Sequence, residues 1–175
     1  MLQTKIVDYV VDDEMLDSDD SFAIIQPVWS YADIYGSLED YESSLARFSG
    51  PQRLVFAIHW YASEVNNGGH DQFFFNSTGI VWPDALEGFK EIGSEKAYAI
   101  LFEATSRFGV KPSRDRELRM EQLERIEGGF DDLDDRFYEL DEDIYTLSID
   151  YARKHRTGFY FKGKVETYEL PDLTD

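Results

Sequence analysis

The sequence contains no cysteine, so a disulfide, a cysteine metal ligand and a cysteine nucleophile are all excluded. It also lacks any apolar run approaching the roughly 20 residues of a membrane-spanning helix. The first residues, Met1 to Tyr9, do not have the basic, apolar and small-residue regions of a signal peptide. We therefore expect a cytoplasmic protein that does not enter a membrane.

Basic residues are scarce relative to acidic ones. Only 17 Lys and Arg accompany 36 Asp and Glu among the 175 residues, which gives a formal net charge of −19. A chain this negative repels nucleic acid and anionic membranes, and it favours partners with basic surfaces. Disorder is not expected, because 15% of the residues are aromatic and disordered acidic chains have few aromatics. The length predicts one folded domain.

The acidic residues are clustered, and the densest cluster lies between Glu127 and Asp143. This window holds one base, Arg136, and nine acids: Glu127, Asp131, Asp132, Asp134, Asp135, Glu139, Asp141, Glu142 and Asp143. Apolar residues recur in it every three or four positions, at Phe130, Leu133, Phe137, Leu140 and Ile144. This spacing predicts one amphipathic helix of about 14 residues, with an apolar buried face and an outer face that is almost entirely carboxylate.

A helix of this composition contains like-charge pairs four residues apart. They are Asp131/Asp135, Asp135/Glu139 and Glu139/Asp143, while Asp132/Arg136 is the attractive pair at this spacing. Each repulsive pair costs roughly 0.2–0.5 kcal/mol. The cluster therefore indicates either a solvated face that keeps the protein soluble or an ordered negative surface for a cationic partner.

Two smaller acidic clusters lie nearer the N-terminus. Residues 8–20 carry seven acids and no base, among them Asp17, Asp19 and Asp20. A third cluster includes Glu39 and Asp40. The first of these is either a frayed, solvated N-terminal segment or a further part of a partner-binding surface.

Apolar periodicity and cap residues predict an all-α fold. Helices are expected from Ser21 toward Ile34, near Leu38–Phe48, from Gly50 to a stop at Gly68-Gly69, over Pro83–Ile92, from Ser94 to Phe108, over 113–127 and from Phe130. The strand-like segment Gly158–Leu170 is expected to form a hairpin or to pack along the helices. We predict a single-domain multi-helix bundle with an acidic N-terminal segment (1–19), a helical core (20–156) and a C-terminal tail (157–175).

The densest group of polar side chains lies at residues 64–79, EVNNGGHDQFFFNSTG. A metal-dependent hydrolase would use His70 with Asp71 or Glu64, and His59 would have to join them. No spacing typical of a metal site, a nucleophile elbow or a phosphate-binding loop accompanies these residues. The favoured interpretation is structural: Asn and Gln side chains bind backbone groups at a helix junction, and Phe73 and Phe74 enter the core.

The same run resembles the signature E-V-x-N-G-G-x-x-Q-F-F-x-N-S-x-G of a bacterial family first known as a domain of unknown function. The resemblance extends over roughly residues 20–150, and the charge pattern is similar to that of the acidic DNA-mimic members of the family. It implies a mostly helical homodimer whose carboxylates imitate duplex phosphates. The motif residues, interpreted as structural, are Asn67, Gly68, Gly69, Gln72, Phe73, Phe74, Asn76 and Gly79.

These observations together predict a non-enzymatic DNA mimic that needs no cofactor or metal and does not bind nucleic acid itself. Its expected partner is a DNA-binding protein, namely a helix-turn-helix transcription factor. The expected contact residues are Asp131, Asp132, Asp134, Asp135, Glu139, Asp141, Glu142, Asp143, Asp17, Asp19, Asp20, Glu39 and Asp40. The alternatives are an acidic adaptor or immunity-type protein that binds through a groove, and the hydrolase centred on His70 and Asp71.

Overall fold

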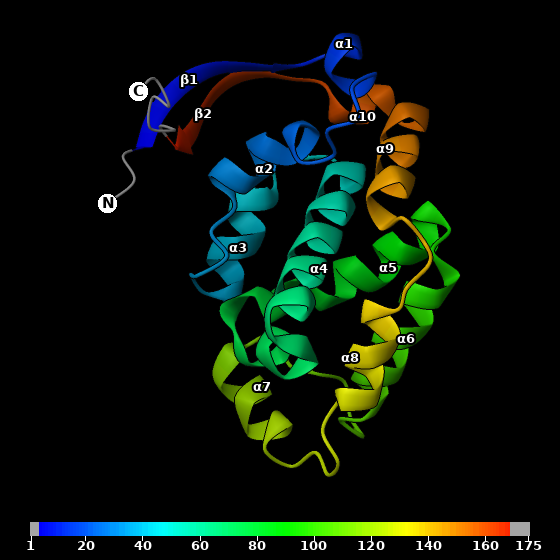
Figure 1. Cartoon of the computed structure of the whole chain (residues 1–175). Coiled ribbons are helices and arrows are strands. Elements are labelled where there is room, and N and C mark those ends of the chain that lie inside the picture. Colours follow the sequence, from blue (N-terminus) through cyan, green and yellow to red (C-terminus); the bar gives the residue numbers. More distant parts are fainter. Residues whose placement is uncertain (1–3, 169–175) are drawn as a thin grey trace, which may run out of the picture.

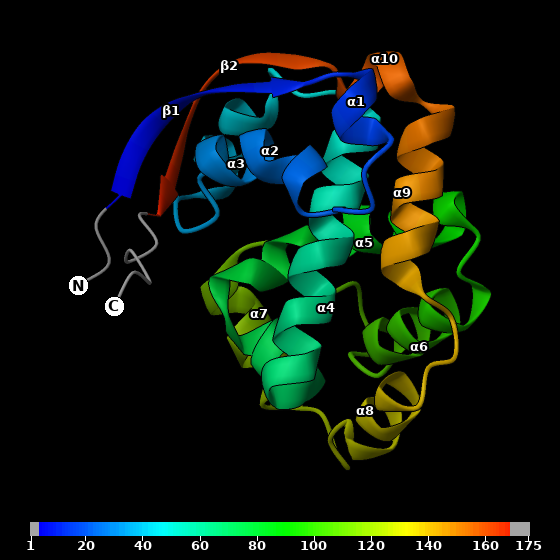
Figure 2. The same cartoon turned by 45° about the horizontal axis from the view of Figure 1, so that its top comes forward.

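The computed structural model describes residues 4–168, in which shorter helices surround one long helix, α4 (Figures 1 and 2). The elements in chain order are β1 (Thr4–Val11), α1 (Asp13–Leu16), η1 (Ala23–Ile25), α2 (Gln26–Tyr31), α3 (Leu38–Leu45), α4 (Gly50–Phe75), η2 (Ser77–Val81), α5 (Trp82–Ile92), α6 (Glu95–Ser106), α7 (Arg116–Leu123), α8 (Asp131–Tyr138), α9 (Ile144–Lys154), α10 (Arg156–Phe159) and β2 (Phe161–Tyr168). Within these residues, no helix has the length and apolar character needed to cross a membrane.

Helix α4 forms the centre of the core because most of its side chains are apolar. It begins with a capping box, in which Ser49 and Gln52 each accept a hydrogen bond from the other's backbone N–H, and Pro51 lies in its first turn. Phe56 and Tyr61 are among its fully buried side chains. Helices α2, α5, α7, α8, α9 and α10 all contact it. These six helices therefore pack directly on α4.

Helix α4 does not end at Gly68-Gly69, as the sequence predicted, but bends there and continues to Phe75. Gly68 and Gly69 have non-helical backbone angles, and Gly69 has a φ of 73°. Such a φ favours glycine, and a Cβ at Gly69 would also collide with the carboxylate of Asp134. The predicted glycine break is therefore confirmed, and the sequence did not predict the second helical segment that continues from it to Phe75.

The expectation of an all-α fold was incomplete, because the two ends of the described chain pair as a sheet. Strands β1 and β2 are antiparallel, with Thr4 opposite Tyr168 and Val11 opposite Phe161. The predicted extended C-terminal segment is thus confirmed as β2, but its partner lies about 150 residues away rather than in a local hairpin. Helix α2 holds β2 in place, since Ser30 and Tyr31 donate hydrogen bonds to carbonyls of β2.

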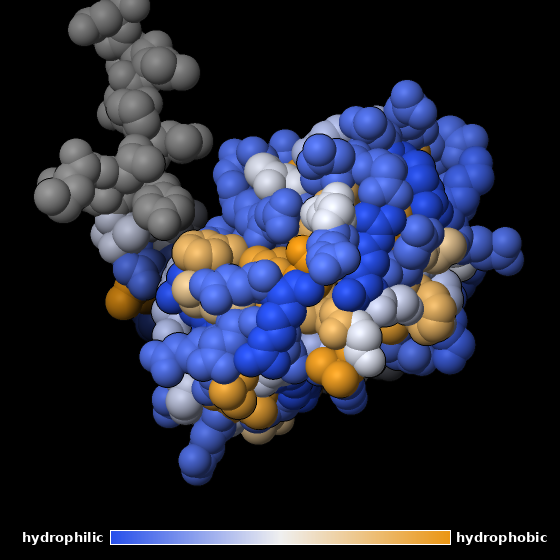
Figure 3. All heavy atoms as spheres, turned by 90° about the horizontal axis from the view of Figure 1, so that it is seen from below, coloured by the Kyte–Doolittle hydropathy of each residue, from blue (hydrophilic) through white to orange (hydrophobic). Residues whose placement is uncertain are grey.

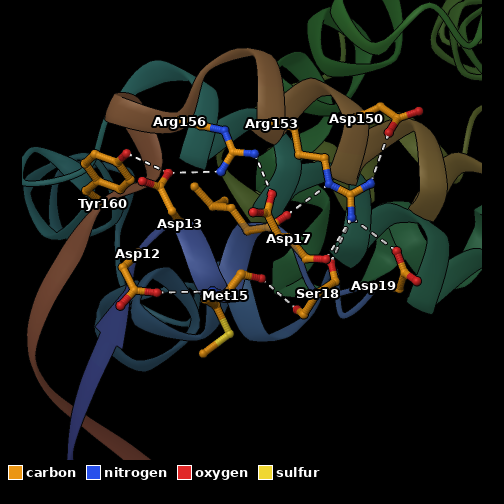
Figure 4. A network of polar contacts seen from close by, with 11 residues as sticks. Asp12, Asp13, Met15, Asp17, Ser18, Asp19, Asp150, Arg153, Arg156 and Tyr160 are labelled. Carbon is orange, nitrogen blue, oxygen red and sulfur yellow. Dashed lines mark hydrogen bonds and ion pairs between the residues drawn. The ribbon is translucent and has the colours of Figure 1, made fainter.

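The acidic cluster at residues 8–20 is ordered rather than frayed. Arg156 pairs with Asp13 at 2.9 Å and with Asp17 at 2.5 Å, while Arg153 pairs with Asp19 at 3.2 Å (Figure 4). The Arg153 guanidinium also donates to the backbone carbonyls of residues 16, 17 and 18. Two arginines from the C-terminal helices therefore attach this segment to the body of the protein.

The predicted acidic helix from Phe130 to Ile144 is two helices. Helix α8 has eight residues and ends at Tyr138, and α9 begins at Ile144. Asp143 caps α9, because its carboxylate accepts hydrogen bonds from the backbone N–H groups of Tyr145 and Thr146. The apolar spacing continued through the break, which explains why periodicity alone predicted one helix.

Arg119 occupies a position that the charge pattern did not predict. Instead of pairing with Asp115, which caps α7, its side chain is fully buried. It donates to the carbonyls of Phe74 at 2.8 Å and Asn76 at 2.7 Å, and to those of Ser113 and Arg114. Burial lowers its pKa to about 10. Arg119 thus connects the end of α4 to the loop before α7.

Other predicted helices agree with the structure. Helices α3 and α6 fall within the ranges expected for them, and α5 begins one residue earlier than expected, at Trp82. Gly93 ends α5 in the left-handed conformation. The helix expected from Ser21 toward Ile34 is instead the short η1 followed by α2, with Pro27 in the first turn of α2.

Replacing Arg119 with methionine should lower the free energy of unfolding by about 2–4 kcal/mol, because several buried carbonyls lose their hydrogen-bond donor. Urea denaturation measures the change. Arg125→Met is the matched control, since that side chain is 76% exposed and its loss should change stability by less than about 0.5 kcal/mol. Equal effects of the two substitutions would contradict the role given to Arg119.

Candidate partner-binding surface

Helix α8 places its apolar and acidic residues on opposite sides. Leu133 and Phe137 are buried. Asp131, Asp135 and Glu139 are exposed, and within residues 4–168 they make no hydrogen bond or ion pair through their side chains. These three carboxylates therefore face solvent without a neutralising arginine or lysine. We call Asp131, Asp135 and Glu139, together with Asp71, the α8 acidic surface.

Asp71 belongs to this surface because the kink of α4 brings it beside the start of α8. A Cβ at Gly129 would lie 3.9 Å from the Asp71 carboxylate. Burial, with the negative charges of Asp134 and Asp131, raises the pKa of Asp71. Sequence reasoning missed this neighbour, since Asp71 was considered only as a possible catalytic acid. Desolvation is the larger cause of the raised pKa of Asp71, and the two neighbouring carboxylates add to it.

Asp132, predicted to share the same acidic face, is paired within the protein. Arg107 from α6 donates to both of its carboxylate oxygens, at 2.7 and 2.6 Å, and the hydrogen bond from Arg107 lowers the pKa of Asp132. Arg136, expected to pair with Asp132, instead contacts Glu103 at 2.7 Å. These pairs attach α8 to α6.

Three acids after α8 also have partners inside the protein. Glu142 accepts hydrogen bonds from the Ser94 hydroxyl and the backbone N–H of Lys96, so its carboxylate, rather than Ser94, caps α6. Asp141 pairs with Lys96 at 2.5 Å, and that hydrogen bond lowers the pKa of Asp141. Hydrogen bonds from Thr146 lower the pKa of Asp143, the cap of α9.

The predicted contact residues nearer the N-terminus are distributed between pairing and capping. Asp17 and Asp19 pair with the arginines described above. Asp20 accepts hydrogen bonds from the backbone N–H groups of Phe22 and Ala23, and Asp40 forms a capping box with Ser37. Glu39 is exposed and makes no side-chain hydrogen bond or ion pair in the described part of the chain. The structure thus does not bring the thirteen predicted acids onto one face.

Figure 3 views the end of the molecule at which α7 and α8 lie. Hydrophilic residues cover most of this end, and the apolar residues form separate patches between them. The α8 acidic surface therefore belongs to a largely polar surface.

Most of the motif residues contact other parts of the fold, which supports the structural interpretation. Glu64 is buried, and its carboxylate accepts hydrogen bonds from Gln72 at 2.7 Å, Asn76 at 3.0 Å and Thr78 at 2.7 Å. These bonds hold the second half of α4 and the following turn against the first half. At Gly79, a Cβ would lie 2.6 Å from the carbonyl oxygen of Phe73 and 2.7 Å from Arg119 Nε, so only glycine fits. Phe73 and Phe74 are fully buried, whereas Asn67 is exposed.

His70 is a buried link between α4 and α8. Its Nδ1 lies 2.5 Å from the Asp134 carboxylate and its Nε2 lies 2.6 Å from the Tyr61 hydroxyl. Nδ1–H donates to Asp134, which leaves the Nε2 lone pair to accept from Tyr61. The backbone N–H of His70 also donates to Asp134 at 2.9 Å. Asp134, predicted as a surface contact, is therefore an anchor that holds α8 on the kink of α4.

The residues of the hydrolase hypothesis lie in separate surroundings. His59 packs between Phe22 and Tyr145, whereas His70 contacts Tyr61 and Asp134. Among residues 4–168 there is no group of three or more histidine and carboxylate side chains arranged to hold a metal ion. The site geometry therefore supports a structural role for His70.

Comparison with known proteins identifies the family. The chain matches the family described as DMP19-like protein over residues 46–155, and it therefore belongs to that family. The match runs from the end of α3 through α9 and includes the complete motif at residues 64–79. No curated protein and no solved structure matched the chain.

His70→Ala should lower the free energy of unfolding by about 2–4 kcal/mol, because it removes a buried ring together with its hydrogen bonds to Asp134 and Tyr61. Asp71→Ala, the neighbouring control, should change stability by less than about 0.5 kcal/mol, because Asp71 is exposed. Chemical denaturation of both variants measures the difference. An enzymatic activity that either variant lost at unchanged stability would overturn the structural interpretation.

Stability should fall as the pH is lowered from 6.5 toward 4. Burial lowers the pKa of His59 from 6.5 to about 4 and also lowers that of His70, so below pH 6.5 the unfolded chain takes up protons that the folded chain does not. His59→Phe should reduce this loss by up to about 1.4 kcal/mol per pH unit. Denaturation at several pH values tests this, and parallel curves for the two proteins would contradict it.

Proposed function

We propose that this protein is a DNA mimic that occupies the DNA-binding site of a bacterial transcription factor and relieves its repression. Membership of the DMP19-like family suggests a DNA-mimic role and hence a DNA-binding protein as partner. The observation that carries the proposal is the α8 acidic surface, whose carboxylates face solvent without internal cations in a chain of net charge −19. A basic DNA-binding surface would supply the missing cations.

The spacing of the carboxylates supports imitation of phosphates. Asp131 and Asp135 are one helical turn apart, or about 6 Å along the axis. Phosphates of one DNA strand advance about 3.4 Å per step, so every second phosphate has a similar spacing. Helix α8 is only about 12 Å long, which is shorter than the single helix expected from the sequence. A full DNA footprint therefore needs acids from other segments as well.

A second copy of the chain would supply the remaining length. Helix-turn-helix repressors read two half-sites about 34 Å apart with a two-fold symmetric dimer. Two α8 acidic surfaces related by a dyad could match two such half-sites. We therefore propose a helix-turn-helix protein as the partner and a homodimer as the active form.

The structure divides the predicted contact residues into three groups by their internal contacts. Asp131, Asp135, Glu139 and Glu39 have no internal partner among the described residues. Those paired with arginine or lysine are partly neutralised: Asp17, Asp19, Asp132 and Asp141. Those that cap or anchor helices are needed for the fold: Asp20, Asp40, Asp134, Glu142 and Asp143. We propose that the first group, joined by Asp71, contributes most to partner binding.

Neutralising Asp131→Asn, Asp135→Asn and Glu139→Gln together should weaken partner binding most at low salt, where exposed charges are least screened. The slope of log affinity against log salt should become shallower between about 50 and 200 mM. The unfolding free energy should change by less than about 0.5 kcal/mol, because Asp131/Asp135 is the one repulsive pair four residues apart within α8. The assay is competition by this protein in a gel shift of the repressor with its operator, using a repressor captured from lysate at low salt.

The control variant carries the same loss of charge elsewhere: Glu91→Gln, Glu95→Gln and Glu117→Gln. These residues are exposed on α5, α6 and α7, so the control separates position from net charge. The control should compete nearly as well as wild type. Wild-type affinity in the α8 triple variant would exclude this surface, and retardation of DNA by the protein alone would exclude mimicry. Binding that is insensitive to salt would favour the groove-binding adaptor.

A further inference from the structure

A hollow of about 420 Å³ lies where the segment before η1 meets α4 and α9. Figure 2 shows this segment crossing α4 beside α9. Aromatic side chains line the hollow, namely Phe22, Trp29 and Tyr145. Phe22 and Tyr145 are each about 40% exposed. Its volume is in the range typical of ligand pockets. An adjoining hollow of about 500 Å³ shares Phe22 and Trp29, so these two rings form a wall between them.

The aromatic rings are held in place by packing beneath them. Trp29 stacks on Trp60 with ring centroids 4.3 Å apart and planes 12° apart, and Phe22 packs against Trp29 at 5.0 Å. A stacked pair of indoles is rigid because each ring blocks rotation of the other. The wall therefore offers preformed aromatic faces rather than mobile side chains.

His59 is an unpartnered polar group that lines this hollow. Its side chain is only 6% exposed, and its Nε2 has no hydrogen-bond partner within the described part of the chain. Buried polar atoms without partners are rare and need an explanation. Burial lowers the pKa of His59 to about 4, so the ring is neutral at pH 7 and can accept a hydrogen bond. Nε2 is enclosed by protein atoms, so a ligand in the hollow that carries N–H groups would donate to Nδ1, the ring nitrogen that stays accessible and makes no hydrogen bond in the described part of the chain.

The charges around the hollow are negative. Asp19 and Asp20 line it, and the negative charge of Asp20 also acts on His59. Arg153 pairs with Asp19 at 3.2 Å, which leaves Asp20 as the carboxylate without an arginine or lysine partner in residues 4–168. Aromatic faces together with a carboxylate attract cations, because the ring face is electron-rich.

We propose that this hollow binds an arginine side chain of the basic protein partner. The guanidinium would stack on Phe22 and Trp29, bind the carboxylate of Asp20 and donate a hydrogen bond to His59. Arginine fits better than lysine, because its planar head group stacks on aromatic rings and carries five N–H donors. The proposal rests on the proposed function for the identity of the partner, but the hollow can be tested without that partner.

The probe is N-acetyl-arginine amide, and the neutral isostere N-acetyl-citrulline amide is its control, both at matched ionic strength. The indole N–H signal of Trp29 in a two-dimensional NMR spectrum reports binding at the hollow. Trp82 is an internal control, because its indole is engaged with the carbonyl of Pro112 elsewhere in the protein. The arginine probe should shift the Trp29 signal in a saturable manner and leave Trp82 unchanged, while the citrulline probe should shift neither.

Three variants test the three components of the hollow. Asp20→Asn removes the charge but retains an oxygen that accepts from the N–H groups of Phe22 and Ala23. His59→Phe retains an aromatic ring without nitrogen, and Phe22→Ala removes an exposed ring with little effect on the core. Each should weaken binding of the arginine probe by about threefold or more. Phe102→Ala, an equally exposed ring on α6, is the matched control and should leave binding unchanged.

The outcomes separate this inference from the proposed function. Equal binding of the arginine and citrulline probes, or unchanged binding in Phe22→Ala and Asp20→Asn, would overturn the arginine pocket. In that case competition with operator DNA could still succeed through the α8 acidic surface. If the arginine probe binds as predicted but the protein does not compete with DNA, the arginine-binding hollow is supported and the proposed DNA-mimic function is refuted. Folding of each variant is checked by circular dichroism, and the exposed Phe22 remains informative if His59→Phe fails to fold.

Discussion

The contact between Asp134 and the kink of α4 determines how the negative charge is presented. Gly69 lets α4 bend, and the bend exposes a backbone N–H and an imidazole that both donate to Asp134. Tyr138, the last residue of α8, donates to the carbonyl of Val65 at 3.0 Å. The middle and the C-terminal end of α8 are therefore attached to α4, and these two contacts fix the position of the exposed carboxylates on and beside the helix. Without this attachment, a helix of eight residues would be too short to be stable.

The acidic residues of this chain have several different structural roles. Some cap helices, as Asp143 does, and some bind arginines that join distant segments, as Asp132 does with Arg107. Net charge alone therefore overstates the charge available to a partner. Within residues 4–168 the fold provides no cation for Asp131, Asp135 and Glu139, and the proposed function assigns recognition of the partner to these residues. Their mutual repulsion remains unrelieved until a basic surface approaches.

Local signals predicted much of the fold, whereas contacts between distant segments were not predictable. The cap at Ser49, the stop at Gly93 and the structural role of the Glu64–Gly79 motif follow from neighbouring residues. Arg119 was missed because its burial depends on the space left by Gly79, about 40 residues earlier. The pairing of β1 with β2 was missed because neither strand has a partner nearby in sequence. Asp134 looked like a surface acid because nothing near it in sequence shows that His70 lies beside it.

A DNA mimic differs from other binding proteins in one testable respect: the partner should bind this protein with the same residues that it uses to bind DNA. Hydrogen–deuterium exchange on the captured transcription factor tests this most directly, with operator DNA and this protein added in separate experiments. The account predicts that both ligands protect the same segments of the partner, and that residues 131–139 of this protein are protected in return. Protection of a different surface of the partner would contradict the central claim, even if binding were tight.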